Sequence, residues 1–252
     1  MVSIKSEREI ELMRHAGHIN YLCHKYLEKK LKPGITTKEI DELAGKFMKE
    51  HDCVSSSLGY EGYPGYICIS INDEVVHGIG SSRKIKNGDI VSLDICMSYK
   101  GYHSDSAATY PVGTITKEKQ ELIDNTKKAL YEGISIIKEG IKLGDVSNTI
   151  EKCAHRHHLG VVEELCGHGI GTKLHEDPDV PNFGEAGKGL TLKAGMTLAI
   201  EPMLNLGTKH VYMLDDDWTI VTADGKPSAH FEHTVLVKKD GYEILTGEIN
   251  NG

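Results

Sequence analysis

The sequence predicts an α+β fold in which pairs of helices cover a largely antiparallel β-sheet. Two observations carry this prediction. A long amphipathic helix followed by a shorter one occurs twice in the chain, and strand-like segments follow each pair. Because this order of elements repeats, we expect two related halves, about 1–110 and 111–252, within a single domain spanning 1–252.

The first helix pair is expected near the N-terminus. Apolar residues recur three or four positions apart from about Glu7 to Lys30, which is the period of an amphipathic helix. The sequence "KPG" then ends this helix. Thr36 or Thr37 can cap a second helix, which must pack its apolar face against another element. That face consists of Ile40, Leu43, Ala44 and Phe47.

The second helix pair repeats the first. A helix is expected from about Lys117 to Lys138, followed by "KEGI" and a further helix. With an offset of 106 residues, "KPGITTKEIDELAGKFMKE" aligns with "KEGIKLGDVSNTIEKCAHR", and Gly34 matches Gly140. Identity between the two stretches is thin, so the repeated order of elements carries the prediction of related halves.

Strands are expected after each helix pair, where β-branched and aromatic residues are punctuated by Gly, Asn and Asp. The predicted strands are residues 67–72, 89–99, 102–110, 197–204, 218–223 and 230–237.

Composition narrows the class of protein. The chain has 39% hydrophobic and 26% charged residues and no apolar run near the roughly 20 residues that cross a bilayer, so we expect no membrane role. Its charged N-terminus lacks the apolar core of a secretory signal, which predicts a cytoplasmic protein. A formal charge of −8 disfavours specific nucleic-acid binding. The six cysteines form no CxxC pair and are expected to be reduced thiols.

The glycine-rich stretch "CGHGIGTKLHEDP" carries two histidines, His168 and His175. They could be metal ligands, catalytic groups or ordinary polar residues of a loop. The stretch alone does not decide between these alternatives.

Two acidic residues interrupt apolar strands. If the chain turns at Lys100-Gly101, position 94 faces 107 and position 96 faces 105 in an antiparallel pair. Asp94 and Asp105 are then diagonal neighbours on one face, with roughly 7 to 8 Å between their backbones. An isolated Asp would be read as an exposed or edge position. Two carboxylates aimed at one point repel each other unless they share a proton or a metal.

Glu201 and Glu232 repeat this pattern of acids within strand-like segments. Four such carboxylates with a nearby imidazole suit a divalent Mn, Fe, Co or Zn ion. Their total charge exceeds what one divalent ion needs, which favours two ions close together.

With these residues in place, the chain resembles the methionine aminopeptidases, specifically the short type I form of the pita-bread metallopeptidase fold. The resemblance spans nearly the whole chain and rests on "NDEVVHGI", "SLDICMSYKGYHSD", "GHGIGTKLHEDP", "AIEPM" and "FEHT". It implies a curved antiparallel sheet with two pseudo-symmetric halves, each contributing a pair of covering helices, in one catalytic domain.

The resemblance also implies a ligand set for two divalent ions, with Co, Mn, Fe or Zn as candidates. Asp94 would chelate one ion, His168 and Glu201 would bind the other, and Asp105 and Glu232 would bridge both.

The implied reaction removes the initiator methionine from nascent proteins, with a preference for a small second residue. A metal-activated water would attack the first peptide carbonyl, His175 would stabilise the oxyanion, His77 would lie near the substrate amide, and Glu201 would relay the proton. The implied methionine pocket consists of Tyr60, Tyr63, Cys68, Leu174 and Trp218. Such residues also commonly fill cores. The resemblance further implies a monomer that works near the ribosome.

Three positions depart from the family pattern. Leu174 stands where Phe is frequent, Ser57 where Cys is frequent and His230 where Gln is common. These changes bear on pocket shape, and His230 also places an imidazole two residues from Glu232.

Other interpretations remain open. Aminopeptidase P and prolidase share the fold and ligands but generally carry an additional N-terminal domain, for which we expect no room here. Type II methionine enzymes carry an insertion that the spacing from His168 to Glu232 does not accommodate. A metal-free peptide-binding protein would have lost ligands, and a metal-storage site would not explain His77 and His175.

Overall fold

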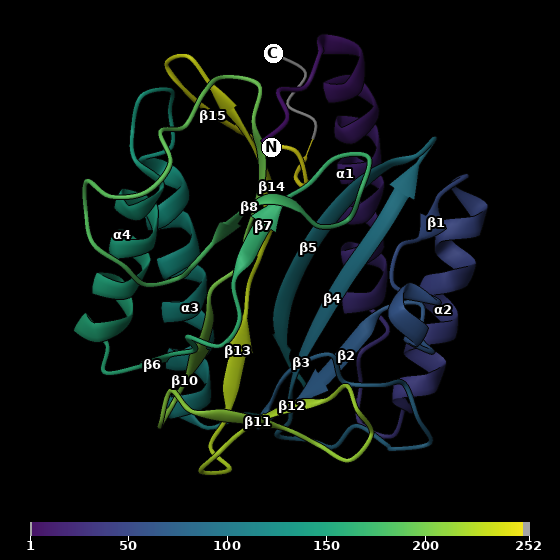
Figure 1. Ribbon diagram of the computed structural model, residues 1–252. Coiled ribbons are helices and arrows are strands. Elements are labelled where there is room, and N and C mark those ends of the chain that lie inside the picture. Colours follow the sequence, from purple (N-terminus) through teal and green to yellow (C-terminus); the bar gives the residue numbers. More distant parts are fainter. Residues whose placement is uncertain (1, 249–252) are drawn as a thin grey trace.

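The computed structural model describes residues 2–248. In this part of the chain four α-helices flank a central set of antiparallel strands. Figure 1 shows α1 and α2 on one side of the strands and α3 and α4 on the other. The mixed helix and antiparallel-sheet class predicted from the sequence is therefore present.

The first helix pair consists of α1 (Glu7–Glu28) and α2 (Thr37–Glu50). The predicted cap of the second helix is confirmed. The Thr36 hydroxyl accepts a hydrogen bond from the Glu39 N–H, and the Glu39 carboxylate accepts one from the Thr36 N–H. This reciprocal capping box satisfies two backbone donors that would otherwise be free at the helix start.

The second pair consists of α3 (Lys117–Ser135) and α4 (Leu143–Arg156). Both ends of α4 lie 106 residues after the corresponding ends of α2, which is the offset expected from the sequence. The turns before the two shorter helices also match, because Gly34 and Gly140 have φ angles of 97° and 94°. The two helix pairs thus share their backbone geometry as well as their order.

The strands form four hydrogen-bonded sheets within residues 2–248, and every named pair is antiparallel. The first sheet contains β1 (Val54–Ser55), β2 (Cys68–Ile71), β4 (Ile90–Tyr99) and β5 (Tyr102–Pro111). The five-stranded sheet contains β7 (Gly167–Gly169), β8 (Glu176–Val180), β9 (Thr197–Ile200), β14 (His233–Lys238) and β15 (Gly241–Ile244). One three-stranded sheet contains β6 (Gly160–Val161), β10 (Met203–Asn205) and β13 (Ser228–His230). The other contains β3 (Glu74–Val76), β11 (Val211–Met213) and β12 (Ile220–Thr222).

The β4–β5 hairpin has the predicted register. Asp94 pairs with Ala107, and Cys96 pairs with Asp105. The turn residues Lys100 and Gly101 have φ angles of 50° and 82°, as a tight two-residue hairpin turn requires. The two aspartates therefore lie on one face of the hairpin, as diagonal neighbours.

Two predicted strands are each divided into two shorter strands. The segment 197–204 is interrupted at Glu201 and Pro202, and proline has no N–H with which to continue a ladder. The segment 230–237 is interrupted at Glu232, where the chain changes from pairing with β10 to pairing with β9. Both glutamates thus lie at breaks between strands.

The two halves meet along β5. Glu232 and Ala107 exchange backbone hydrogen bonds, with N···O distances of 2.9 Å from Glu232 N and 3.4 Å from Ala107 N. The Thr234 hydroxyl accepts from the Asp105 N–H at 2.9 Å and donates to the Asp105 carbonyl at 2.8 Å. These bonds bring the segments that carry Asp105 and Glu232 side by side. We term this contact, between residues 105–109 and 230–234, the seam.

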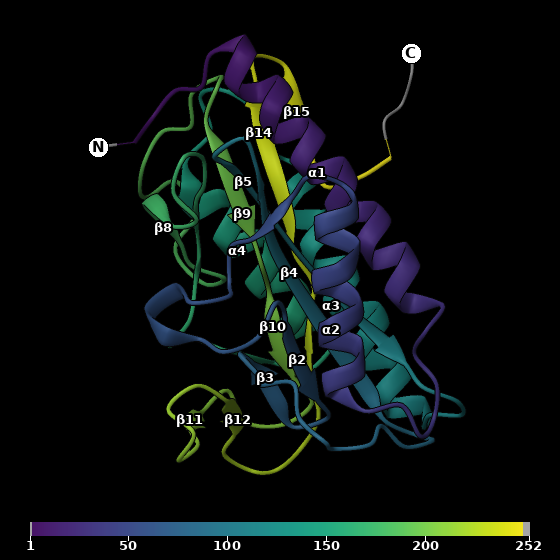
Figure 2. The ribbon, with the colours of Figure 1, turned by 90° about the vertical axis from the view of Figure 1, so that its right-hand side faces the viewer.

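Each helix pair covers its own apolar core. One core joins α1 and α2 to β2 and β4, and the other joins α3 and α4 to β9, β10, β13 and β14. Figure 2, turned by 90°, shows α1 and α2 in front of the strands. Within residues 2–248, none of the helices combines the length and apolar character needed to cross a membrane.

Candidate active site

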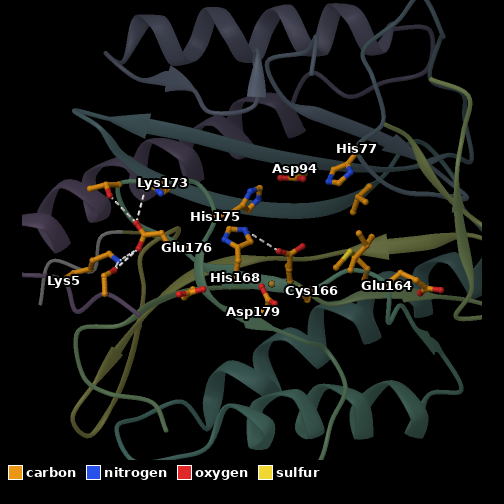
Figure 3. A pocket seen from close by; sticks show the side chains of 18 of the residues that line it. Lys5, His77, Asp94, Glu164, Cys166, His168, Lys173, His175, Glu176 and Asp179 are labelled. Carbon is orange, nitrogen blue, oxygen red and sulfur yellow. Dashed lines mark hydrogen bonds and ion pairs between the residues drawn. The ribbon is translucent and has the colours of Figure 1, made fainter. Parts of the chain in front are cut away.

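The five residues predicted as metal ligands come together around one cavity of about 250 Å³. They are Asp94, Asp105, His168, Glu201 and Glu232. They reach it from β4, β5, β7 and the two strand breaks, so both halves contribute. The cavity adjoins an outer groove of about 840 Å³, which Asp94, His168 and Glu201 also line. Figure 3 shows this groove, with Asp94, His168 and His175 lying close together.

His168 faces the carboxylates with one defined nitrogen. Its Nε2 lies 3.7 Å from Asp105 Oδ2 and 3.6 Å from Glu201 Oε1. Its Nδ1 lies 2.8 Å from the Gly169 carbonyl oxygen, which can only accept a hydrogen bond. The proton of the neutral ring therefore belongs on Nδ1, and the Nε2 lone pair is directed at the acids, as in a metal-binding histidine.

The carboxylates are crowded and shielded from water. Burial, and then the charge of Asp105, raise the pKa values of Asp94, Glu201 and Glu232 well above their usual range. Burial also opposes ionisation of Asp105, but its interactions with His168, Cys96 and His175 together outweigh this effect and lower its pKa. The shifts in pKa thus have opposite directions within one cluster, with ionisation favoured at Asp105 and opposed at its three neighbours. A divalent cation would allow all of them to ionise.

The donor set fits such an ion. Glu232 is 2% exposed, and its Oε1 has no hydrogen-bond partner among the described residues. Potential ligand atoms of Asp105, His168 and Glu232 lie within 4.8 Å of one another. Carboxylate oxygens with one imidazole suit several divalent transition metals. These residues could therefore hold a metal, and the unpartnered oxygen would find its partner there.

Cys96 also reaches this cluster, and the sequence interpretation gave it no role. Its Sγ lies 3.0 Å from Asp105 Oδ1 and 3.6 Å from Asp94 Oδ1, and its thiol can donate to either. Strand alternation could have identified it, because a residue two positions after Asp94 shares its face.

His77 and His175 lie beside the cluster and line both the cavity and the groove. Burial is the main cause that lowers the pKa of His175 to about 4, and burial also lowers that of His77. Both rings are therefore neutral near pH 7. The Tyr60 hydroxyl lies 2.7 Å from His175 Nδ1, a contact between residues far apart in the sequence.

The predicted methionine pocket forms the rest of the cavity wall. Tyr60, Tyr63, Cys68, Leu174 and Trp218 all line the cavity, as does Ser57. The rings of Tyr63 and Trp218 pack edge to face, with centroids 5.0 Å apart. The Tyr63 hydroxyl donates to the Gly78 carbonyl at 2.8 Å, so its polar end is satisfied away from the cavity. The structure thus joins a largely apolar pocket to the acidic cluster.

A buried salt bridge in the wall of the groove was not predicted from the sequence. Lys5 and Glu176 form a salt bridge of 2.7 Å, and their side chains are only 5% and 14% exposed. Burial opposes ionisation of Glu176, but hydrogen bonds from Lys5 and Ser3 lower its pKa to about 2. The pair ties the N-terminal segment to the loop that carries His175 (Figure 3).

Buried acids, a histidine whose Nε2 faces them and two neutral histidines beside an apolar pocket define the class of protein as a metal-dependent hydrolase. The model of metallopeptidase family M24 matches residues 11–239, and the chain belongs to this family. Membership of a metallopeptidase family implies use of a divalent metal.

Within the family, the chain is similar to methionine aminopeptidases. It is 48% identical over 246 residues to "Methionine aminopeptidase 1" of Bacillus subtilis (strain 168), covering 98% of this chain and 99% of that relative. The crystal structure of the methionine aminopeptidase from Thermotoga maritima matches with a TM-score of 0.97 and 42% identity, covering 98% of this chain and 100% of the other. The resemblance and the pita-bread fold predicted from the sequence are thus confirmed.

A prolidase from Pyrococcus furiosus shares the fold alone. It matches with a TM-score of 0.79 at 21% identity, covering 97% of this chain but 65% of the prolidase. The prolidase therefore has a region outside the matched fold.

Proposed function

We propose that this protein removes the initiator methionine from nascent proteins as a metal-dependent aminopeptidase that prefers a small second residue. The observation that carries the proposal is the convergence of five ligand-type residues at one apolar pocket, in a chain similar to methionine aminopeptidases over nearly its whole length.

The proposed metal centre holds two divalent ions, with Co, Mn, Fe and Zn as candidates. Asp94 would hold one ion, His168 and Glu201 would hold the other, and Asp105 and Glu232 would serve both; all five side chains line the same cavity. When bound, the ions supply activation of a water molecule and polarisation of the first peptide carbonyl.

The chain's own residues then handle protons and orientation. Glu201 takes the proton of the attacking water and passes it to the leaving amine. With the Tyr60 hydroxyl donating to His175 Nδ1, the other ring nitrogen of His175 carries a proton and donates to the developing oxyanion. His77, which lines the same cavity, orients the substrate amide.

Specificity comes from the pocket next to these groups. The methionine side chain lies against Tyr63, Cys68, Leu174 and Trp218, where burial of its apolar atoms favours binding. The free α-amino group faces the carboxylate cluster, which restricts cleavage to chain ends. We further propose that the enzyme is a cytoplasmic monomer with a single catalytic domain and acts near the ribosome.

The test uses protein stripped of metal with a chelator and then supplied with Mn, Fe, Co or Zn. Release of the first residue is measured from Met-Ala-Ser, Met-Pro-Ser and Leu-Ala-Ser peptides, with Glu201→Ala as the inactive control. We expect metal-dependent release from Met-Ala-Ser, none from Leu-Ala-Ser and none by the variant.

Two outcomes contradict the proposal. Cleavage of the Met-Pro peptide alone favours a proline-directed enzyme. Metal binding without turnover of any peptide favours a non-catalytic protein and removes support for the pocket roles.

A further inference from the structure

His230, at the end of β13, is buried without a hydrogen-bond partner. The residue is 1% exposed, and neither ring nitrogen has a partner among the described residues. Leaving a buried polar group unsatisfied destabilises a folded protein markedly. A feature that costs this much in the fold calls for a physical explanation.

The backbone holds the ring in this place. The Thr109 hydroxyl accepts from the His230 N–H at 2.9 Å and donates to the His230 carbonyl at 3.0 Å, as part of the seam. His230 also pairs with Met203 in the sheet. Sheet and seam contacts therefore fix the backbone position from which the ring projects.

A carboxylate of the proposed metal cluster faces the ring. His230 Nε2 lies 3.7 Å from Glu201 Oε2, while His168 Nε2 lies 3.6 Å from Glu201 Oε1. Each oxygen of Glu201 thus faces a different imidazole. The His230 contact is about 0.5 Å longer than a hydrogen bond, a gap that a small rotation of the Glu201 side chain would close.

The two imidazoles favour opposite tautomers. Since the Gly169 carbonyl requires the proton of His168 on Nδ1, its Nε2 offers a lone pair. His230 Nδ1 has no hydrogen-bond partner among the described residues, and its Nε2 faces an acceptor. The proton of the His230 ring therefore belongs on Nε2. One histidine can bind a metal and the other can donate to the same carboxylate.

We propose that His230 is a positioning residue of the metal centre. Its Nε2–H donates to Glu201 Oε2 and thereby holds Glu201 Oε1 toward His168, where an ion would be held. The inference rests on the metal centre of the proposed function and adds a residue to it. Groups that orient a metal ligand in this way typically change metal affinity by about 10- to 100-fold.

Two variants of similar size separate donation from packing. His230→Gln keeps an N–H donor, and His230→Leu fills the space without one. Co²⁺ binding to metal-free protein is measured by calorimetry and by the visible absorption of the bound ion. We expect about 10- to 100-fold weaker binding in His230→Leu, with an altered spectrum, and affinity within about threefold of the wild type in His230→Gln.

Either of two other results overturns the inference. Unchanged affinity in His230→Leu means that the contact with Glu201 has no effect on the ion. Equal losses in both variants mean that the imidazole itself is required, as a ligand or for packing. The melting temperatures of the metal-free variants, compared with that of the wild type, show whether either substitution causes a folding defect.

A second measurement needs no variant. NMR of isotope-labelled histidines in the Zn²⁺-loaded wild type is expected to place the His230 proton on Nε2 and the His168 proton on Nδ1. A His230 proton on Nδ1 would overturn the inference. If the wild type does not release methionine but gives the expected binding and NMR results, the proposed function is contradicted and the role of His230 is still supported.

Discussion

The two halves of the chain share a scaffold but deliver their acidic residues differently. Ile85 donates its N–H to the Ile35 carbonyl at 2.8 Å, and Leu192 donates to the Ile141 carbonyl at 2.9 Å, at corresponding places beside the shorter helices. The short strands β1 and β6 follow α2 and α4 with the same offset of 106 residues. Backbone architecture is therefore repeated in detail.

The ligand-type residues do not follow this repeat. Asp94 and Asp105 project from unbroken ten-residue strands, whereas Glu201 and Glu232 lie at breaks between short strands. The histidine that we propose as a ligand, His168, lies in the C-terminal half. The comparison teaches that a repeated backbone can hold a site that is not repeated, because side-chain chemistry and local breaks are free to differ.

The largest expected effect tests whether both halves are indispensable. Asp94→Asn from the N-terminal half and Glu201→Gln from the C-terminal half should each lower kcat/KM for Met-Ala-Ser by at least about 1000-fold, because each removes a charge from the metal centre. Activity and metal content are measured on both variants. The control is Glu42→Gln, an exposed acid on α2, which should keep wild-type activity. A loss of kcat/KM below tenfold in either variant would mean that the acid from that half of the chain is not essential for activity.

Metal removal should reveal the repulsion between the halves. Burial, and then the charge of Asp105, raise the folded-state pKa values of Asp94, Glu201 and Glu232, so in the metal-free protein these three groups bind more protons folded than unfolded. Their contribution to the free energy of unfolding should therefore be complete below about pH 4 and be lost as pH rises, by up to about 1.4 kcal/mol per pH unit for each group titrating. Buried histidines with lowered pKa values act in the opposite direction, so the contribution of the acids is measured as the difference between wild type and Glu201→Gln in urea unfolding. We expect the metal-free wild type to lose stability relative to this variant as pH rises above about 4 and to gain stability relative to it with Zn²⁺, and a difference that does not change with pH would contradict the prediction.

The longer helices should differ in their tolerance of an added methyl group. A Cβ on Gly17 in α1 would lie 2.2 Å from the Leu245 carbonyl oxygen, whereas one on Gly133 in α3 would lie 2.6 Å from the Ile150 side chain. Backbone yields less readily than a side chain. We expect Gly17→Ala to cost about 2–3 kcal/mol of unfolding free energy and Gly133→Ala about 1 kcal/mol. Urea denaturation checks the order, and a larger loss at Gly133 would reverse the argument.

The smallest expected effect concerns the two equivalent turns. Gly34 and Gly140 have positive φ angles, and an added Cβ would meet nothing within 4 Å at either site. Each Gly→Ala change should therefore cost about 1 kcal/mol, from backbone strain alone. Equal losses in urea denaturation would show that the halves match in energy as well as geometry. A difference above about 1 kcal/mol would limit the equivalence to shape.

Sequence patterns predicted those features of the fold that depend on residues close together in the chain. The Thr36 cap, the helix offset and the register of Asp94 and Asp105 follow from nearby residues, and the structure has all three. Glu201 and Glu232 were recognised as acids in apolar segments, but each predicted strand was continuous. The break at Glu232 depends on a change of partner strand, which no local pattern records.

Contacts between distant segments explain the remaining gaps. Tyr60 meets His175, and Lys5 meets Glu176, only after both halves have folded. Neither pair has a spacing that hydrophobic periodicity or turn chemistry could identify. The family resemblance supplied roles for His175 and Tyr60, yet their direct contact comes from the folded chain.

The seam also gives the metal centre a part in folding. Asp105 and Glu232 belong to different halves and are brought together by backbone hydrogen bonds across the seam. Neither half alone holds a complete set of donors, so an ion would bind strongly only after both have docked. Binding free energy that is gained only in the docked state stabilises that state. The ion would therefore link the two halves and stabilise only the chain in which both are folded. A partly synthesised chain would therefore gain no stability from metal ions in its surroundings.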